Sequence, residues 1–576
     1  MTSEPGLPKA ALESCSSLKL FKRNPGSIKL LGLAIVLAMA TAMAACSEQS
    51  EESSKTPARI APLLKGLGSH THPVTTRSPL AQRYFDQGLN LVYAFNHAEA
   101  VRSFRQAALI DPDCAMAYWG QALALGPNIN APMSTEHARE AYEAIQLALK
   151  SKASSSEHDY IQALATRYSN DEKQDRKSLD RAYAEAMRDL AHRYPNDNDV
   201  QTLYAASLMN LRPWNYWEGD GKSYDETAEV VPVLEAVLKR NPNHIGANHY
   251  YIHAVEATNS PERAIPSAER LQAEVTGAGH LVHMPAHVYI RVGRYADASE
   301  ANVRAIAADE NYITQCRAQG IYPLGYYPHN IHFLWASSSM EGRSQVALDA
   351  ANKVASKVEV GKLDEIPSWA RIFTVIPLYA KVRFGKWDEI LNEKSPKLNR
   401  PFYTGIWHYA RGLAFTAKGQ SGAARQELAR LNKMANDHAV AELEVGATTV
   451  GKLFEIASSV LAGEIEAKGG NFEKAISHLE RAVRLQDGLP YNEPADWYYP
   501  VRQSLGAVLL AAGYPAEAET VYWQDLEQNP ENGWSLFGLA KSLRSQEKND
   551  QAAEIERRFR NAWARADVAL TASRFD

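Results

Sequence analysis

Small residues, aromatic residues and prolines recur at fixed spacing in this sequence, and the recurrence restricts the folds that the chain can adopt. In a stretch of about 34 residues that starts at Ala81, positions 8, 20, 24, 27 and 32 are occupied by Gly88, Ala100, Phe104, Ala107 and Pro112. Small side chains let two helices approach closely, an aromatic ring fills the space between them, and proline ends a helix. The spacing therefore predicts a pair of packed helices as the repeating unit.

The same spacing returns near the C-terminus. It is carried by Gly463, Ala475, Leu479 and Ala482, then by Gly506, Ala518, Tyr522 and Pro530 in a register that starts at Tyr499, and last by Ala540 and Ala552 in a register that starts at Gly533. The pattern is similar to the tetratricopeptide repeat (TPR), whose tandem copies stack into a solenoid. No stretch alternates convincingly as a strand. We therefore expect an all-α fold, a TPR-like α-α superhelix, with loop insertions that start at Leu125 and after Asn210.

The N-terminal region has the order of a secretory signal. Basic residues precede an uncharged apolar run of 16 residues, Leu30–Ala45, which ends on small residues directly before Cys46. The block that ends at Cys46 resembles a bacterial lipobox, in which the cysteine is lipidated, and Ser47 is similar to the pattern of lipoproteins sent to the outer membrane. The other interpretation is an uncleaved membrane anchor. In either case we expect an exported protein, lipid-anchored at the outer membrane and facing the periplasm in the first case.

The pattern divides the chain into six segments. We expect a signal peptide (1–45), a flexible tether (46–80), N-terminal TPR-like helices (81–240), histidine-rich TPR-like repeats (241–355), further TPR-like helices (356–455) and C-terminal TPR repeats (456–576). The tether is expected because the residues after Cys46 are polar and acidic without apolar periodicity.

Charge and cysteine content narrow the functional classes. The formal net charge of −5, from 62 basic and 67 acidic residues, gives no basic field of the kind that phosphate backbones require, so we expect no nucleic-acid partner. Outside the leader only Cys114 and Cys316 remain, too few for a disulfide framework, and whether they pair stays open.

Histidines gather in the middle of the chain. Aligning the alanines at repeat position 20 starts three repeats at Ile245, Gly279 and Pro328, and positions 2, 5 and 9 of these repeats are held by His249, His253, His280, His283, His287, His329 and His332. In TPR repeats these positions face the concave groove. We therefore expect all seven side chains in one trough, joined by Glu256 and Arg291.

Two interpretations of this cluster stay open. Imidazoles at i and i+4 on a helix recur as ligands of zinc, copper or iron, and His249, His253 and Glu256 form one such set while His283 and His287 form another. Alternatively the histidines act as hydrogen-bond partners in a peptide-binding groove, or some are satisfied in the core. Pro285 either kinks the helix and re-aims the histidines beside it or marks a late helix start.

An aromatic segment precedes the last repeats. It contains Tyr491, Glu493, Trp497 and Arg502, which would cap the groove or bind a partner, or would form a structural plug between repeats.

Three phrases of the sequence carry a family resemblance. FNHAEAVRSFRQAALIDPDCAMAYWGQALALGPNIN, HMPAHVYIRVG and YNEPADWYYPVRQSLGAVLL resemble a widespread, largely uncharacterised family of bacterial TPR proteins with an HMPxH motif. The resemblance implies a TPR fold and no particular reaction.

Two functions follow as hypotheses. The first is an exported scaffold that binds a protein or peptide partner in its groove. The second is a metal-binding protein, or an enzyme that uses the metal, built on the groove histidines. The sequence has no phosphate-binding glycine loop, GxSxG elbow, CxxC pair or HExxH motif.

Overall fold

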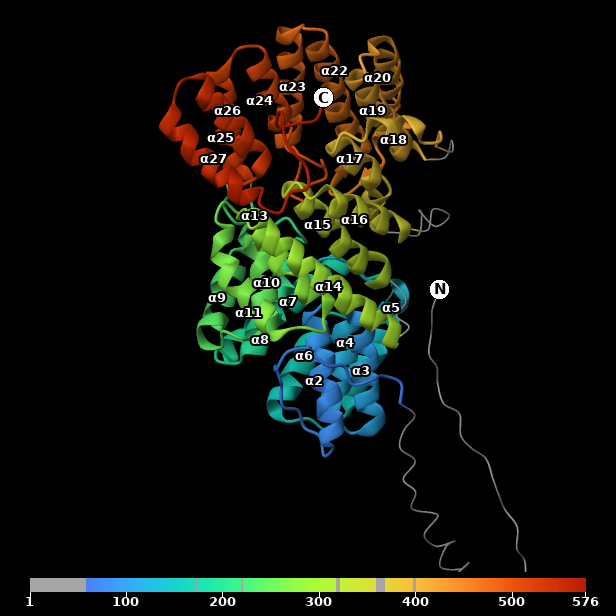
Figure 1. Cartoon of the computed structure of the whole chain (residues 1–576). Coiled ribbons are helices and arrows are strands. Elements are labelled where there is room, and N and C mark those ends of the chain that lie inside the picture. The colour runs from blue at the N-terminus through green and yellow to red at the C-terminus, as the bar shows by residue number, and fades with distance from the viewer. Residues whose placement is uncertain (1–58, 172, 219–220, 317–321, 359–367, 397–399) are drawn as a thin grey trace, which may run out of the picture. The chain divides into compact units, whose positions relative to one another are not determined.

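The computed structural model describes residues 59–576 except 172, 219–220, 317–321, 359–367 and 397–399. The predicted signal peptide and Cys46 lie outside the described residues. Helices account for most of this part of the chain, and they pair with their neighbours in sequence as helical hairpins (Figure 1). The structure confirms the all-α TPR-type fold. None of the helices in the described part is long and apolar enough to cross a membrane.

The helices follow one another in three groups. The first contains α2 (Pro79–Tyr93), α3 (His97–Ile110), α4 (Ala115–Leu125), α5 (Thr135–Lys150), α6 (Ser155–Ala165), α7 (Arg176–Arg193), α8 (Asn198–Met209), η1 (Asp225–Thr227) and α9 (Val230–Arg240). The second contains α10 (Ile245–Val255), η2 (Pro261–Ala264), α11 (Ile265–Glu274), α12 (Gly279–His283), α13 (Pro285–Arg291), α14 (Tyr295–Cys316), η3 (Tyr322–Tyr326), α15 (Tyr327–Met340) and α16 (Ser344–Ser356).

The third group completes the chain. It contains η5 (Ser368–Thr374), α17 (Ile376–Arg383), α18 (Trp387–Asn392), α19 (Pro401–Ala417), α20 (Ser421–Ala435), α21 (His438–Ala441), β1 (Glu444–Val445), β2 (Thr448–Thr449), α22 (Val450–Lys468), α23 (Phe472–Asp487), α24 (Arg502–Ala511), α25 (Pro515–Gln528), α26 (Gly533–Ser545) and α27 (Asn549–Ala562). The two-residue antiparallel pair β1–β2 is too short to leave a period in the sequence, and it was not predicted.

Glycine and an aromatic ring lock the helices of a repeat together. Phe104 of α3 is fully buried between Gly88 of α2 and Gly120 of α4, and a Cβ atom at Gly88 would come within 2.6 Å of its ring. Tyr522 is enclosed in the same way by Gly506 and Gly538. Positions 8 and 24 therefore do what the repeat pattern predicts, because only glycine leaves room for the ring.

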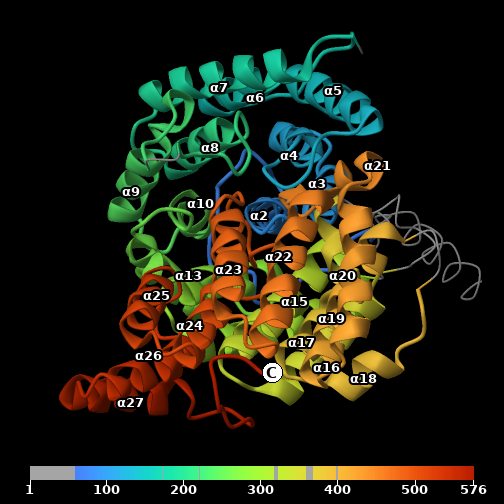
Figure 2. The same cartoon turned by 90° about the horizontal axis from the view of Figure 1, so that it is seen from above.

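The predicted repeat registers in the middle of the chain are confirmed. Helices α10 and α12 begin at Ile245 and Gly279, as predicted, and α15 begins at Tyr327, one residue before the predicted start. Successive helices from α4 to α9 contact one another along a curve, which Figure 2 shows from above.

Two hydrophobic clusters meet in the middle of the array. One cluster extends from the N-terminal helices to Phe333, and the other extends from Ile306 to α27. Helices α14 and α15 contribute to both clusters, so the middle repeats lie at the junction where two apolar cores adjoin.

Residues 59–78, here called the strap, differ from the expected flexible tether. They have no helix, but they pack on α2 and α3, and Ala61 and Leu67 are buried. The backbone N–H groups of Ile60 and Leu64 donate to Gln106 and Gln87 at 2.6 and 2.7 Å. Polar composition alone did not reveal these side-chain acceptors on the helices, which hold the strap in place.

Asp199 at the start of α8 holds the strap at a second point. Its carboxylate lies 3.0 Å from His70 Nε2 and 2.8 Å from His72 Nδ1, and it also accepts the Tyr93 hydroxyl at 2.6 Å and His244 Nε2 at 3.1 Å. Burial opposes charge on both partners. Nevertheless hydrogen bonds from histidines keep the pKa of Asp199 well below its usual value, and the hydrogen bond to Asp199 raises the pKa of His72.

We predict that Phe104→Ala lowers the free energy of unfolding by about 3–5 kcal/mol, because it leaves a cavity between three helices. Leu109→Ala on the same helix is the control, since Leu109 is 45% exposed, and its effect should stay within about 0.5 kcal/mol. Urea denaturation followed by circular dichroism measures both. Equal effects of the two changes would contradict TPR-type packing at Phe104.

We predict that attachment of the strap depends on pH. The raised pKa of His72 contributes stability that is complete below 6.5 and is lost as the pH rises through its folded value, and the lowered pKa of Asp199 contributes stability that is present above 3.8 and lost as the pH falls. Protection of the strap amides from hydrogen exchange should therefore be greatest between these two values.

Asp199→Asn should reduce that protection about tenfold and flatten its pH dependence. The control is Asp189→Asn, because Asp189 is an exposed carboxylate on α7. A strap that exchanges equally in all three proteins would show that the cluster around Asp199 does not hold it.

Candidate metal centre

The structure brings the predicted histidines together in a buried chamber. Helix α10 supplies His249 and His253, α12 supplies His280 and His283, α13 supplies His287, and α15 supplies His329 and His332. All are buried except His329, which is partly exposed. Loop residues and the aromatic side chains described below cover part of the groove here.

Pro285 interrupts the helix between two of these histidines. Helix α12 ends at His283, α13 begins at Pro285, and Met284 between them keeps helical dihedral angles. The break is only one residue long because the proline occupies the first position of α13, where a helix needs no N–H donor. His283 and His287 consequently still lie on the same side, with their Nε2 atoms 2.6 Å apart.

Uncharged acceptors fix the orientation of two rings. His249 donates from Nδ1 to the backbone carbonyl of Tyr93 at 2.6 Å, one of the carbonyl groups left free at the end of α2. His283 donates from Nδ1 to Asn302 Oδ1 at 2.7 Å, while the Asn302 amide donates to the carbonyl of Ala298. Both rings therefore carry their proton on Nδ1 and present a bare Nε2 to the chamber.

A single carboxylate orients two further rings. Glu256, directly after α10, accepts from His253 Nδ1 through Oε1 and from His287 Nδ1 through Oε2, each at 2.7 Å. Glu493 accepts from the same His287 nitrogen at 2.8 Å, and Tyr491 donates to both carboxylates at 3.2 and 3.0 Å. A carboxylate behind an imidazole fixes its tautomer and makes its other nitrogen a better metal ligand.

The nitrogen atoms face one another across short distances. His249 Nε2 lies 3.1 Å from His280 Nε2, and His253 Nε2 is buried without a hydrogen-bond partner among the described residues. His283 and His287 both donate through Nδ1, so their facing Nε2 atoms would each present a lone pair if both rings were neutral. A shared proton resolves this contact, because 2.6 Å is a hydrogen-bond distance and is shorter than the separation of two nitrogens that each lie about 2.0–2.1 Å from one metal ion.

Burial separates the charge states of these rings. It lowers the pKa of His253 and His329 to about 3 and the pKa of His249 to a value well below normal. Burial also opposes charge on His287, but Glu493 and Glu256 outweigh it and raise its pKa to about 10. The pKa of Glu493 rises to about 7 because of its burial and the neighbouring Glu256. His249, His253 and His329 are thus neutral imidazoles, which can bind metals. They surround the charged contact of His287 with the two carboxylates.

Three groups in the chamber have the composition of a metal site. Ligand atoms within 4.8 Å of one another come from His249, His253 and His280; from His283, His287 and His329; and from His253, Glu256, His287 and Glu493. Imidazole and carboxylate ligands suit zinc, copper and iron.

A fourth group, His70, Asp199 and His244, belongs to the attachment of the strap. His244 Nδ1 accepts a hydrogen bond from the Ala247 N–H at 3.1 Å, so its proton lies on Nε2 and is donated to Asp199. Asp199 accepts hydrogen bonds from His244 and His72, whereas His70 Nε2 lies 3.0 Å from its carboxylate without a well-aligned hydrogen bond.

A cavity of about 260 Å³ opens from the histidines. Its lining includes His253, His280, His287 and His329, with Tyr326, Phe373 and Trp214 among its aromatic walls. Trp214 comes from the insertion after Asn210, and its indole donates to Asn130 of the other insertion at 3.0 Å. Both predicted insertions therefore contribute to the chamber, a role that sequence analysis did not predict for them.

Phe95 is a further wall that sequence analysis missed. It follows α2 with a positive φ of 56°, which is rare for a bulky residue, and its ring stacks on His280 with ring centres 5.3 Å apart. Tyr93 and Asn302, which orient the histidines, were missed too. The sequence offers no signal for Tyr93 and Asn302, since both lie on helices outside the three histidine-bearing segments.

Four predicted residues do not contribute ligands to the groups. Arg291 donates to the carbonyl of Glu256 at 3.0 Å and so caps the end of α10. Trp497 is buried against Tyr379 and Tyr409, and Arg502 pairs with Asp487 at 2.7 Å. His332 lines the cavity and stacks on Trp335, but it belongs to none of the groups in the described part of the chain.

The aromatic segment thus divides in two. Tyr491 and Glu493 reach the chamber, whereas Trp497 and Arg502 are structural, as the plug interpretation has it.

Cys114 and Cys316 are free thiols.

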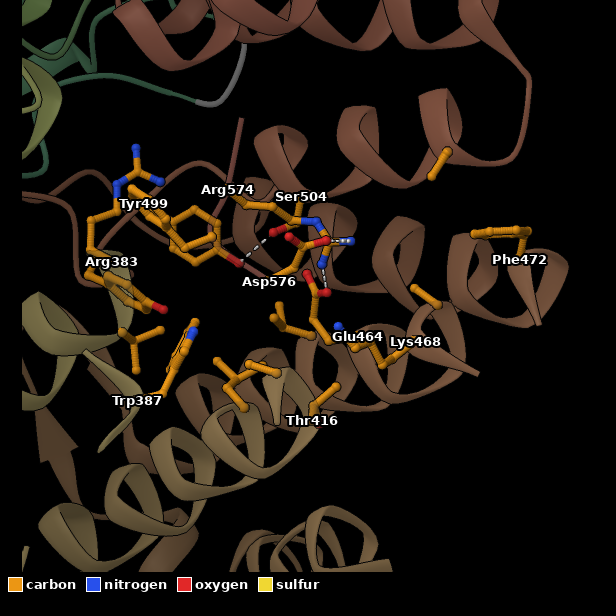
Figure 3. Close-up of a pocket in the computed structure, with 18 residues that line it drawn as sticks. Arg383, Trp387, Thr416, Glu464, Lys468, Phe472, Tyr499, Ser504, Arg574 and Asp576 are labelled. Atoms are coloured by element: carbon orange, nitrogen blue, oxygen red, sulfur yellow. Dashed lines mark hydrogen bonds and ion pairs between the residues drawn. The ribbon is translucent and has the colours of Figure 1, made fainter. Parts of the chain in front are cut away.

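A second cavity of about 210 Å³ lies beside the C-terminus, among α17, α19 and α22 (Figure 3). Arg574 contacts Glu464 there, and Tyr499 shares a hydrogen bond with Ser504 at 3.0 Å. Arg383 donates to Gln503 at 2.7 Å. Arg574 also pairs with Asp576 at 3.7 Å, and none of the metal-type groups found in the described residues lies in this wall.

Comparison with known proteins found no matching family model and no matching curated protein. Among solved structures, human IFIT1 with m7Gppp-AAAA is 12% identical, covers 85% of this chain and 91% of its own, and has a TM-score of 0.29. A chain of the APC/C hetero-tetramer Cut9–Hcn1 is 12% identical, covers 85% of this chain and 78% of its own, and has a TM-score of 0.31. The TPR domain of P58(IPK) is 12% identical at 84% and 92% coverage with a TM-score of 0.20. Resemblances at these scores are too remote to bear on function.

Proposed function

We propose that this protein is a metal-binding protein that holds a transition-metal ion in the histidine chamber of a TPR scaffold. The observation that carries the proposal is the convergence of ligand atoms in the chamber, where ring nitrogens and carboxylate oxygens lie within 4.8 Å of one another and His253 Nε2 and His280 Nδ1 are buried without hydrogen-bond partners among the described residues. The 2.6 Å contact between His283 Nε2 and His287 Nε2 has the length of a hydrogen bond, so a metal ion that binds there displaces the shared proton.

The ligand set indicates the kind of metal. His249, His253 and His283 are held by acceptors behind the ring, as metal-binding histidines usually are. The pKa values lowered by burial keep most of these rings neutral and able to coordinate. Zinc, copper and iron all match imidazole with carboxylate, whereas magnesium and calcium prefer oxygen ligands.

The scaffold supports a second role. TPR arrays generally bind protein partners through their helical surfaces. Most of the chamber histidines are buried, so a peptide or protein partner would use other surfaces of the array, and partner binding and metal binding would occupy separate places.

We predict that the protein, purified without a histidine tag, retains at least one equivalent of zinc, copper or iron through gel filtration. His283→Gln/His287→Gln should weaken metal affinity at least tenfold, since it removes the two facing nitrogen atoms. Plasma mass spectrometry gives the metal content, and circular dichroism checks the fold.

His332→Gln is the matched control, because His332 is buried in the same chamber and lies outside the candidate groups. It should keep the metal. Wild-type protein that releases all three metals after loading would overturn the proposal.

The N-terminal sequence supports a location for this function. We propose that the chain is exported and anchored through a lipid on Cys46, at the outer membrane and facing the periplasm. The support is the order of basic residues, the apolar run Leu30–Ala45 and the small residues before Cys46. Ser47 after the cysteine favours the outer membrane over retention at the inner one.

We predict that Cys46→Ser abolishes palmitate labelling and releases the protein from the membrane fraction, because the acyl chains are its anchor. Cys15→Ser, which changes the other cysteine of the leader, should have no effect. Membrane attachment that survives Cys46→Ser would indicate instead that the apolar run itself remains as the anchor.

A further inference from the structure

The chamber histidines divide into two trios. One trio is His249, His253 and His280, and the other is His283, His287 and His329. Each trio offers three ring nitrogens within 4.8 Å of one another. The two trios share no histidine, and a tetrahedral ion with four ligands cannot take all six. His253 and His287 also form a mixed group with Glu256 and Glu493.

Glu256 lies between the trios. It accepts from Nδ1 of His253, a member of the first trio, and from Nδ1 of His287, a member of the second. The two nitrogens of an imidazole point in roughly opposite directions, so each ring directs Nε2 away from Glu256. Glu256 thus holds one ring of each trio, and the Nε2 atom of each ring lies on the side away from the carboxylate.

Each trio also has an anchor of its own. The Tyr93 carbonyl fixes His249 in the first trio, and Asn302 fixes His283 in the second. In the first trio, His253 Nε2 and His280 Nδ1 are buried without hydrogen-bond partners among the residues that the structure describes. Unpartnered buried nitrogens cost free energy unless a ligand satisfies them.

On the basis of the proposed function, we infer that the chamber holds two transition-metal ions, one in each trio, and that both face one small-molecule site. The 260 Å³ cavity is lined by His253 and His280 of the first trio and by His287 and His329 of the second. Both ions therefore border the same space, which suits a ligand of a few atoms up to the size of an amino acid.

Charge indicates the class of ligand. Two divalent ions bring four positive charges, whereas Glu256 and Glu493 supply at most two negative charges within the buried chamber. Arg291 lies at the carbonyls after α10 and adds a further cation nearby. The loaded chamber carries excess positive charge and favours a small anion, since an uncompensated buried charge is costly.

Metal stoichiometry tests the inference. Native mass spectrometry of the wild-type protein titrated with copper(II) or zinc should show two bound ions. His249→Gln/His280→Gln and His283→Gln/His329→Gln should each bind one, and His332→Gln should bind two. Because the wild-type count and anomalous diffraction of wild-type crystals need no variant, a variant that fails to fold leaves the test intact.

The outcomes separate the two proposals. No bound ion in the wild type overturns both. One ion, lost in either trio variant, retains a metal centre and overturns the pair. Two ions that both persist in the trio variants place the metal elsewhere and overturn the pair as well.

Azide serves as the probe of the shared site. Its absorbance titration on the copper(II)-loaded protein should saturate at one azide per two ions. Saturation at one per ion, or the absence of binding, would overturn the shared anion site.

Discussion

The carboxylate of Glu256 is the interaction on which the histidine chamber depends. It lies at the end of α10 and binds a histidine of its own helix and a histidine of α13, so it fixes the spacing of two neighbouring repeats at the point where their rings meet. Burial strengthens these hydrogen bonds. It also makes the carboxylate costly to bury unless its oxygens accept hydrogen bonds. Tyr491 and Glu493, from a loop more than two hundred residues later, complete the set.

The position of the chamber follows from the architecture of the array. The middle repeats lie where two hydrophobic clusters adjoin, and helices α14 and α15 belong to both. A TPR groove is ordinarily open, but here the insertion residues Asn130 and Trp214 and the 491–493 loop cover it. Departures from the repeat pattern are therefore the parts of the chain that narrow the groove to a small cavity.

Much of this arrangement could be predicted from the sequence because repeat positions carry it. Gly88 and Phe104 identify the helix pairs, and the registers from Ile245 and Gly279 place the histidines on one side of their helices. The sequence does not reveal Tyr93, Phe95 or Asn302, since their roles arise from packing between distant helices. The sequence also does not show that Tyr491 and Glu493 reach the chamber while Trp497 packs in the core. All three lie in one aromatic loop, and only tertiary contacts distinguish their roles. The strap, read as flexible from its composition, is held by acceptors on other helices that local composition does not show.

The turn at Phe95 and the loop at Glu493 are separated by almost four hundred positions along the chain, yet Phe95 stacks on His280 of the chamber and Glu493 lines its cavity. Repeat arrays ordinarily unravel from their ends, because each unit touches only its neighbours. A metal ion or ligand bound in the chamber would link early and late repeats. If any one of these repeats opened, the bound ion or ligand would be released. Its binding free energy would then be distributed over the entire array, which would melt as one body when occupied and in stages when empty.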